Sequence, residues 1–354
     1  WKKISIKTHE KYLNRVESKL KINFQKKKKV LGKNTIFGLM PDWNPVEMIG
    51  KHPSELSLSI YKKLITDSIW AKSRAIMGYK NLSKYKLMYE FSGQPYIDTR
   101  LSLNSFLPKT LPNQIGEKLV NFGIKELSDN PQFHDKVEFE ISFPSYTFDI
   151  KEKIRKKLGQ NLSKKEAKIF IDKIRLLTLK MINEKSPFSY NNILKKIFQL
   201  DKSFKNFNYK DINQIPQLIS ICKNYGTLNF SILARHGFVA KSLLNSLIDK
   251  KVISKEKAEK FEKSLNTITK KMLIDIDKVI KKKLSVTNFM KNYGHLRPGT
   301  YDITSKRYDQ TKNFFFKVDK KKIKINSFNL TKNEQNKIDN ILDKNKFEGI
   351  NHKI

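Results

Sequence analysis

Cysteine is almost absent from the sequence, and this scarcity limits the chemistry of the protein. The single cysteine among 354 residues, Cys222, excludes a disulfide within the chain and is typical of a reducing compartment. As a lone thiol, Cys222 is predicted to be a small core residue rather than a nucleophile. No stretch approaches the ~20 apolar residues of a membrane span, and the first residues lack the apolar stretch of a secretory signal. We therefore expect a cytoplasmic protein without membrane association.

The common signatures of catalytic and metal sites are also missing. The sequence contains no GxxxxGK[ST] phosphate loop, no GxGxxG turn, no GxSxG elbow and no HExxH pair. A zinc-binding cysteine cluster is impossible with one cysteine. The chain therefore has candidate binding residues without a recognisable catalytic motif, and we expect no metal and no cofactor to be bound by this segment.

Acidic residues are few, with 34 Asp and Glu against 72 Lys and Arg, which gives a net charge of +38. Such a charge suggests nucleic acid as a partner, and a basic nucleic-acid-binding module is one alternative reading. The lysines, however, are distributed over almost every polar face, and an Ile- and Asn-rich composition with many lysines is typical of AT-rich coding sequences. We therefore favour a solvated surface and do not expect nucleic acid as a partner.

Arginine is scarce for so basic a chain, because only eight of the 72 basic residues are arginine. Lysine serves where a positive charge is enough, whereas the planar arginine fork is needed to grip a carboxylate or phosphate through two hydrogen bonds. Five arginines lie in stretches dense in Gly, Pro, Asp or His: Arg74, Arg100, Arg235, Arg297 and Arg307. They are candidates for anion binding, and the alternative is that each one anchors a buried carboxylate.

The residue pattern predicts an α+β fold, mostly α-helical, with a small antiparallel sheet in the N-terminal half. Residues 1–30 are predicted to be a helical linker and residues 36–50 an ordered loop, in which Asn44 and Pro45 suit the start of a helix. Alternation of apolar and polar residues predicts a half-buried strand over 137–143. The remaining predictions are a helix over 56–79, a strand pair around the Gly-containing turn at 92–95, a helix over 115–127, capping boxes at 163–166 and 331–334, one continuous helix over 258–272, and a hairpin from 314–318 and 323–328.

Two further stretches carry candidate functional residues. Arg235 and His236 interrupt the apolar stretch 230–248, and a buried arginine requires a carboxylate partner or an anionic ligand. Asp98 and Arg100 are two residues apart in a predicted strand and are expected to point to the same face.

A short window between residues 291 and 309 holds His295, Arg297, Asp302 and Arg307. Asp302 and Arg307 could pair with each other, which is the structural alternative to ligand binding. His295 could be an acid, a base or only a hydrogen-bonding spacer.

Six stretches together resemble the central region of the phosphoenolpyruvate-utilising phosphotransferases, in the branch that is similar to phosphoenolpyruvate synthase, and more distantly rifampicin phosphotransferase. They are MPDWNPVEMIG, ITDSIWAKSR, QPYIDTRLSLNSFLP, HDKVEFE, GTLNFSILARHGFVAKSLL and GHLRPGTYDITSKRYD. The resemblance covers the chain from about residue 36 onward. The six stretches occur in the same order, which makes the resemblance more specific than any one of them.

The resemblance implies one part of a three-part machine. Its other parts would be an ATP-grasp-like domain that uses ATP and Mg²⁺, and a domain whose histidine carries the phosphoryl group to the acceptor. Residues 31–354 would then be the central, acceptor-binding domain of a protein truncated here at both ends, inactive as a fragment. Pyruvate as the acceptor is suggested only by the name of the branch.

Phosphoryl transfer needs positioning and charge neutralisation from the acceptor side. We expect Arg100, Arg235, Arg297 and Arg307 to line one pocket that binds a small anionic or polar acceptor, with Asp42, Asn44, Asp98 and Asp302 as further substrate-binding residues. His295 or His236 is the candidate proton acceptor. A third alternative, a purely structural domain, predicts that the arginines pair internally and leave no open cavity.

Overall fold

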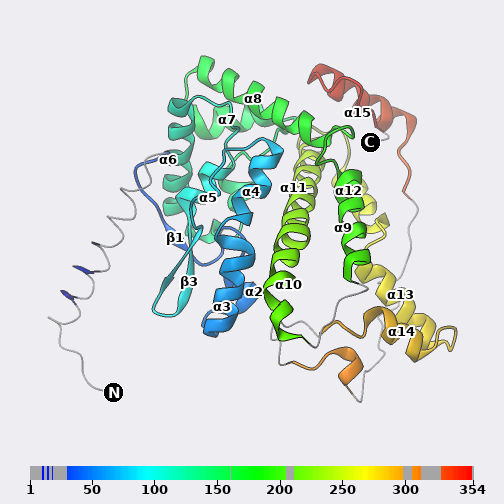
Figure 1. Cartoon of the computed structure of the whole chain (residues 1–354). Helices are drawn as coiled ribbons and strands as arrows, with labels where there is room; N and C mark the ends of the chain where they lie inside the picture. The colour runs from blue at the N-terminus through cyan, green and yellow to red at the C-terminus, as the bar shows by residue number, and fades with distance from the viewer. Residues whose placement is uncertain are drawn as a thin grey trace.

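Helices dominate the computed structural model of the chain, and the strands are confined to its N-terminal half (Figure 1). The structure describes residues 10–11, 14–15, 18, 30–159, 161–204, 211–297, 305–311 and 328–352. Three strands form one antiparallel sheet in the order β1–β3–β2, namely β1 (Phe37–Gly38), β2 (Met88–Phe91) and β3 (Gln94–Asp98). The predicted α+β class, mostly helical with a small antiparallel sheet, is confirmed.

The helices follow one another through short connections along most of the described chain. They are α2 (Pro45–Ile49), α3 (Glu55–Tyr61), α4 (Ile69–Met77), α5 (Thr99–Ser105), α6 (Asn113–Asp129), α7 (Ile150–Leu158), α8 (Lys164–Ile182), α9 (Tyr190–Phe204), α10 (Ile215–Ile221), α11 (Leu228–Asp249), α12 (Lys255–Ser264), α13 (Ile268–Ile280), α14 (Val286–Tyr293) and α15 (Lys332–Lys344). Wider, π-helical turns occupy Lys62–Thr66, Val137–Ile141 and Cys222–Thr227.

The long helix α11 runs between the sheet-containing part and the later helices, and it contacts both α4 and α9 (Figure 1). The largest hydrophobic cluster joins residues from α5, α6, α7, α8 and α11 with Leu342 and Phe347 at the end of α15. A second cluster joins residues from α3, α4, α5, β2 and β3, and it includes the fully buried Trp70 of α4. A third and much smaller cluster joins α13 and α14 through Ile276, Phe289 and Tyr293.

Several local predictions are confirmed by the backbone. The hairpin β2–β3 turns at Ser92 and Gly93, which both have positive φ, as a two-residue hairpin turn with a right-handed twist requires. Both predicted capping boxes are present, at Ser163 and Glu166 before α8 and at Thr331 and Glu334 before α15.

The predicted strand over 137–143 is wrong. Residues Val137–Ile141 form a π-helical turn instead, in which Val137 and Ile141 are buried while Phe139 is 44% exposed. Buried side chains four residues apart match the spacing of a helical turn. The alternation of apolar and polar residues in the sequence therefore does not correspond to the two faces of a strand.

Three further predictions need correction. Arg100 lies in α5 rather than in a strand, and Asp98 caps that helix by accepting a hydrogen bond from the Leu101 N–H at 3.2 Å. The helix expected over 258–272 is broken between α12 and α13, at residues 265–267. Cys222 is exposed rather than a core residue.

Most of the predicted linker, residues 1–30, lies outside the described residues. The described residues 10–11, 14–15 and 18 within it are helical. The hairpin expected over 314–328 also lies outside them, except for Phe328. Among the described residues, no helix is both long enough and apolar enough to cross a membrane.

Candidate functional site

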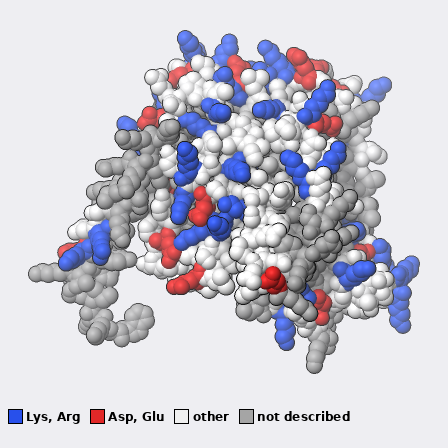
Figure 2. All heavy atoms as spheres, viewed as in Figure 1, with Lys and Arg blue, Asp and Glu red and all other residues white. Residues whose placement is uncertain are grey.

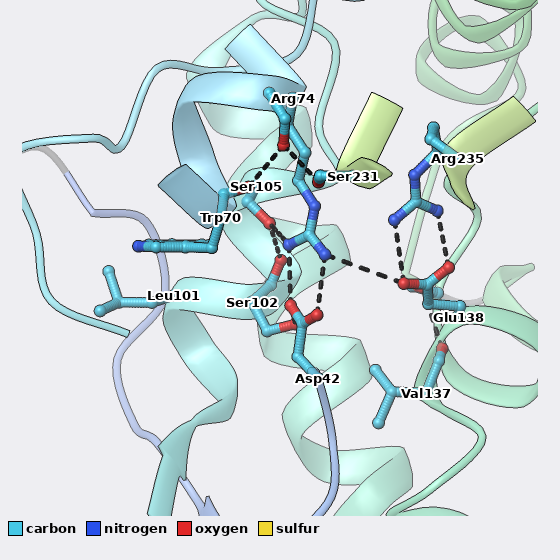
Figure 3. Close-up of polar contacts among 12 residues, drawn as sticks. Asp42, Trp70, Arg74, Leu101, Ser102, Ser105, Val137, Glu138, Ser231 and Arg235 are labelled. Carbon is cyan, nitrogen blue, oxygen red and sulfur yellow. Dashed lines mark hydrogen bonds and ion pairs between the residues drawn. The ribbon is translucent and has the colours of Figure 1, made fainter. Parts of the chain in front are cut away.

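Two arginines and two carboxylates meet in the interior of the protein, and we call Asp42, Arg74, Glu138 and Arg235 the charge cluster (Figure 3). Arg74, on α4, donates from Nη1 and Nη2 to the two carboxylate oxygens of Asp42 at 2.7 and 2.8 Å. The side chains of Arg74 and Asp42 are only 5% and 3% exposed. The planar guanidinium of arginine can make this bidentate contact with a carboxylate, whereas the single ammonium group of lysine cannot.

The second pair joins α11 to the π-helical turn. Arg235 donates from Nη1 and Nη2 to the carboxylate of Glu138 at 2.6 and 2.9 Å. Figure 3 shows the Glu138 carboxylate between the two guanidinium groups, and its Oε1 lies 3.8 Å from Nη2 of Arg74. Two positive and two negative groups therefore share one site, so that their charges cancel formally.

Hydroxyl groups and one aromatic ring complete the surroundings of the charge cluster. Ser102 donates to Asp42 at 2.7 Å, and Arg74 donates to Ser105 at 2.5 Å. The Phe106 ring lies near both guanidinium carbons, at 4.4 Å from that of Arg74 and 5.0 Å from that of Arg235. An aromatic face stabilises a cation that has lost its water, which helps both arginines remain charged in the interior.

The electrostatics of the cluster follow from its burial. Burial alone would lower the pKa of Arg235, but the Glu138 carboxylate together with Tyr79 and Asp42 outweighs the effect of burial, and the pKa is raised. Burial also raises the pKa of the nearby Tyr79 to about 12, so its phenol stays protonated and donates to the Pro144 carbonyl at 2.6 Å.

The loop that presents Asp42 has an unusual backbone. Trp43 and Asn44 both adopt left-handed φ values, of 57° and 35°. Such conformations cost free energy in residues other than glycine and persist only where their surroundings enforce them. Here Asp42 is fixed by Arg74, and the Trp43 carbonyl accepts a hydrogen bond from the Tyr61 hydroxyl at 2.5 Å. Asn44 occupies the cap position before α2 as predicted, although its amide donates to Glu47 rather than capping the helix.

Arg100 does not join the charge cluster. Arg100 and Asn104 lie one helical turn apart on α5, and both bind the incoming chain, where Arg100 Nε and Asn104 Nδ2 donate to the Leu31 carbonyl at 2.9 Å. Ser102 and Ser105 occupy another face of α5, which is turned to the cluster. Asp98 is buried and accepts from the Thr35 hydroxyl at 2.7 Å. Arg100 and Asp98 therefore fix the segment that enters the fold.

The two candidate proton acceptors occupy different settings. His236 has its Nε2 at 2.9 Å from the Phe188 carbonyl oxygen. Because a carbonyl only accepts, Nε2 must carry the hydrogen, which leaves Nδ1 as the acceptor in the neutral ring. His295 is exposed, in the segment that follows α14.

The last two arginines lie beyond α14 and make local contacts. Arg297 donates to the Ser305 carbonyl at 2.9 Å, and Arg307 makes a bidentate pair with Asp309 at 3.0 and 2.8 Å. The Arg307 side chain is 40% exposed. Asp302, the partner considered for Arg307, lies outside the described residues.

The single pocket expected from the sequence is thus not what the described residues show. The structure brings together Asp42 and Arg235, and it places Arg100 with Asp98 at the chain entry and Arg297 with Arg307 after α14. Sequence reasoning missed Glu138, which lies in the stretch predicted to be a half-buried strand, and it did not link Arg74 to Asp42. The requirement that a buried arginine has a carboxylate partner was the signal that could have led to both.

The described residues contain no group of three or more His, Cys, Asp or Glu side chains arranged to hold a metal ion. Comparisons of the chain with protein-family models, with curated proteins and with solved structures give no match.

Proposed function

We propose that the chain is the acceptor-binding part of an ATP-dependent phosphotransferase similar to the phosphoenolpyruvate-utilising enzymes. In this proposal a histidine on another domain of the same protein carries the phosphoryl group, and this chain holds a small anionic or polar acceptor. ATP and Mg²⁺ would act on the ATP-grasp-like domain of the same protein.

One observation carries the proposal. Five of the six stretches on which the family resemblance depends contribute a residue to the charge cluster or a hydrogen bond to its arginines and carboxylates. They supply Asp42, Arg74, Ser102 with Ser105, Glu138 and Arg235 in chain order. These stretches lie far apart in the sequence, so their meeting at one site supports a common task.

The chemistry of the cluster assigns it a supporting role within the proposed function. The terminal nitrogens of both arginines already bind carboxylates, so an acceptor would have to displace a buried, well-paired partner. The cluster instead holds the Asp42 loop, α4, α5 and α11 in fixed relative positions. A fixed arrangement of loop residues is what acceptor positioning requires.

Phosphoryl transfer to pyruvate in the complete protein tests the proposal. The protein that contains this chain together with its neighbouring domains would be incubated with ATP, Mg²⁺ and pyruvate, and the products followed by ³¹P NMR. We expect an acceptor-dependent phosphorylated product and a phosphohistidine intermediate. Neighbouring domains without an ATP site or a carrier histidine, or no phosphorylated product with pyruvate or any of a panel of 2-oxo and hydroxy acids, would refute it.

On the face of the molecule that Figure 2 shows, the distribution of charge does not favour the nucleic-acid alternative. Figure 2 shows lysine and arginine side chains scattered over the visible face, with acidic groups between them, rather than massed in one area. A salt titration of oligonucleotide binding separates the two proposals, because a nucleic-acid module would bind tightly at physiological salt with a steep salt dependence.

A further inference from the structure

A basic cavity lies between α7, α8 and the end of α15, with a volume of about 600 Å³. Six cationic side chains line it: Lys151, Arg155, Lys164, Lys168, Lys344 and Lys346. Within the described part of the chain, none of these six has an ion-pair partner. A seventh cation, Arg175, has its Nη2 3.8 Å from the single lining carboxylate, Asp172. The charge cluster is neutral, whereas this cavity carries a large excess of positive charge.

The floor of the cavity is apolar. Ile154 and Leu158 from α7 and Leu162 before α8 line it, and their side chains are at most 6% exposed. A volume of this size falls in the range of ~300–1,000 Å³ that is typical of small-molecule sites. An apolar floor under a ring of cations suits a ligand with an anionic head and an apolar body.

The third wall comes from a distant part of the sequence and is firmly attached. The fully buried Phe347 packs its ring 5.5 Å from that of Tyr146 and 5.6 Å from that of Phe148, measured between centroids. The Tyr146 hydroxyl donates to the side chain of Asn345, and Arg175 lies 3.5 Å from the Lys346 carbonyl oxygen. These contacts hold Lys344 and Lys346 at the cavity.

Lys346 occupies a backbone position that normally belongs to glycine. It has a φ of 59°, directly after the cap of α15. The Phe347 N–H bonds to the Leu342 carbonyl at 3.0 Å and the Lys346 N–H to that of Asp343 at 2.9 Å, which is the pattern of a helix end closed by a left-handed residue. A lysine is less stable than glycine at this position. Lys251 and Lys282 follow the caps of α11 and α13 in the same conformation, so this backbone position is not specific to the cavity, and what it does is place Lys346 in the cavity wall.

From this geometry we propose that the cavity between α7, α8 and α15 binds a small organic diphosphate, with the phosphates among the lysines and Arg155 and an apolar body over Ile154 and Leu158. The inference does not depend on the proposed function, since it concerns a different part of the molecule.

Calorimetric titration with ADP, adenosine and inorganic pyrophosphate tests the site on the intact chain. ADP combines the anionic head with a ring system, whereas each of the other two probes offers only one of these features. We expect ADP to bind at least about tenfold more tightly than either, with an affinity that falls as salt is raised. Equal binding of pyrophosphate or of adenosine would overturn the assignment, as would no binding of ADP.

Two variants remove a cation from the cavity, and one matched control removes an exposed cation elsewhere. Lys346→Gly and Lys168→Gln should each weaken ADP binding by about three- to fivefold, the range for a partly exposed charge interaction. Lys63→Gln, in the π-helical turn after α3, should leave the affinity unchanged. Because glycine suits a φ of 59°, Lys346→Gly should not lower the thermal midpoint, so weaker binding in this variant is not a folding effect.

Two outcomes would contradict the proposed site. If Lys63→Gln weakens ADP binding as much as the two cavity variants, or if a single-stranded oligonucleotide displaces ADP equally well from all three, the ligand is held by the general surface charge and the cavity is not a site.

Discussion

At the scale of single residues, the scarcity of arginine in a lysine-rich chain acquires a physical meaning. Arg74 and Arg235 occupy interior positions where a planar fork grips a carboxylate through two hydrogen bonds. A lysine would supply the charge there without the second bond. The prediction that these arginines are distinct from the surface lysines is consistent with their burial. Their partners are carboxylates of the chain itself, as the alternative of internal pairing predicted.

Arg74→Lys is therefore expected to destabilise the protein although it keeps the charge. The variant loses one bond to Asp42 or the bond to Ser105, and it should lower the free energy of unfolding by about 1–3 kcal/mol. Urea denaturation measures this loss. The matched control is Arg307→Lys, since the Arg307–Asp309 pair is exposed and should change the free energy by less than about 1 kcal/mol. Equal effects in the two variants would contradict the account.

At the scale of elements, the sequence was informative wherever a local rule decides the structure. The capping boxes at Ser163 and Thr331 and the hairpin turn at Ser92 each depend on neighbours within a few residues, and each was predicted. The π-helical turn at Val137–Ile141 was not predicted, because its conformation accompanies a long-range contact. Glu138 is turned inward by a buried arginine 97 residues later in the chain, and that partner leaves no signal in the local pattern.

The candidate site shows the same difference between features set by local sequence and features set by long-range contacts. Burial of Arg235 was predictable from the apolar helix around it, whereas the separation of Arg100 from it was not. Arg100 was assigned to a strand beside Asp98, but Asp98 caps α5 and so begins a helix that turns Arg100 toward Leu31. A single side chain in a capping role thus changed which face the arginine occupies.

Gly78, which ends α4, allows a test of how tightly that end is packed. It has a φ of 110°, and an added Cβ would lie 2.7 Å from Cδ1 of Leu177 on α8. Gly93 also has a positive φ, of 74°, but an added Cβ would meet nothing within 4 Å. Gly78→Ala should therefore lose about 1–3 kcal/mol more than Gly93→Ala in chemical denaturation, because it adds crowding to the backbone strain that both share. Equal losses would mean that the contact with Leu177 is not tight.

Acid should weaken the attachment of α8 through Glu166. Its hydrogen bond from Lys118, together with those from Ser163, lowers the pKa of Glu166 to about 2 from an ordinary value of 4.5. A lowered folded-state pKa contributes stability that is complete above the unfolded value and is lost as the pH falls from about 4.5 toward 2. Glu166→Gln keeps a residue suited to the capping box but removes the charge. The urea midpoints of the two proteins should differ at pH 6 and converge near pH 2. A difference independent of pH would contradict this assignment.

At the scale of the whole molecule, the hydrophobic interior is divided unevenly. The large cluster joins helices from both halves of the chain, whereas α13 and α14 share a separate cluster with only three buried members, Ile276, Phe289 and Tyr293. A small core resists local opening less than a large one. Hydrogen exchange should therefore be faster in α13 and α14 than in α11. Equal protection in the three helices would show that the smaller cluster does not open by itself.

The charge cluster is the feature on which the account depends most, because its four members join distant stretches of the sequence at one neutral, buried site. A double-mutant cycle on Arg235→Met and Glu138→Leu, followed by urea denaturation, tests it directly. Each single variant leaves a buried charge without its bidentate partner and should lose about 3–5 kcal/mol. The double variant should lose less than either single one, since no partner is left unpaired. Losses that simply add would contradict the account, because the two groups would then not depend on each other.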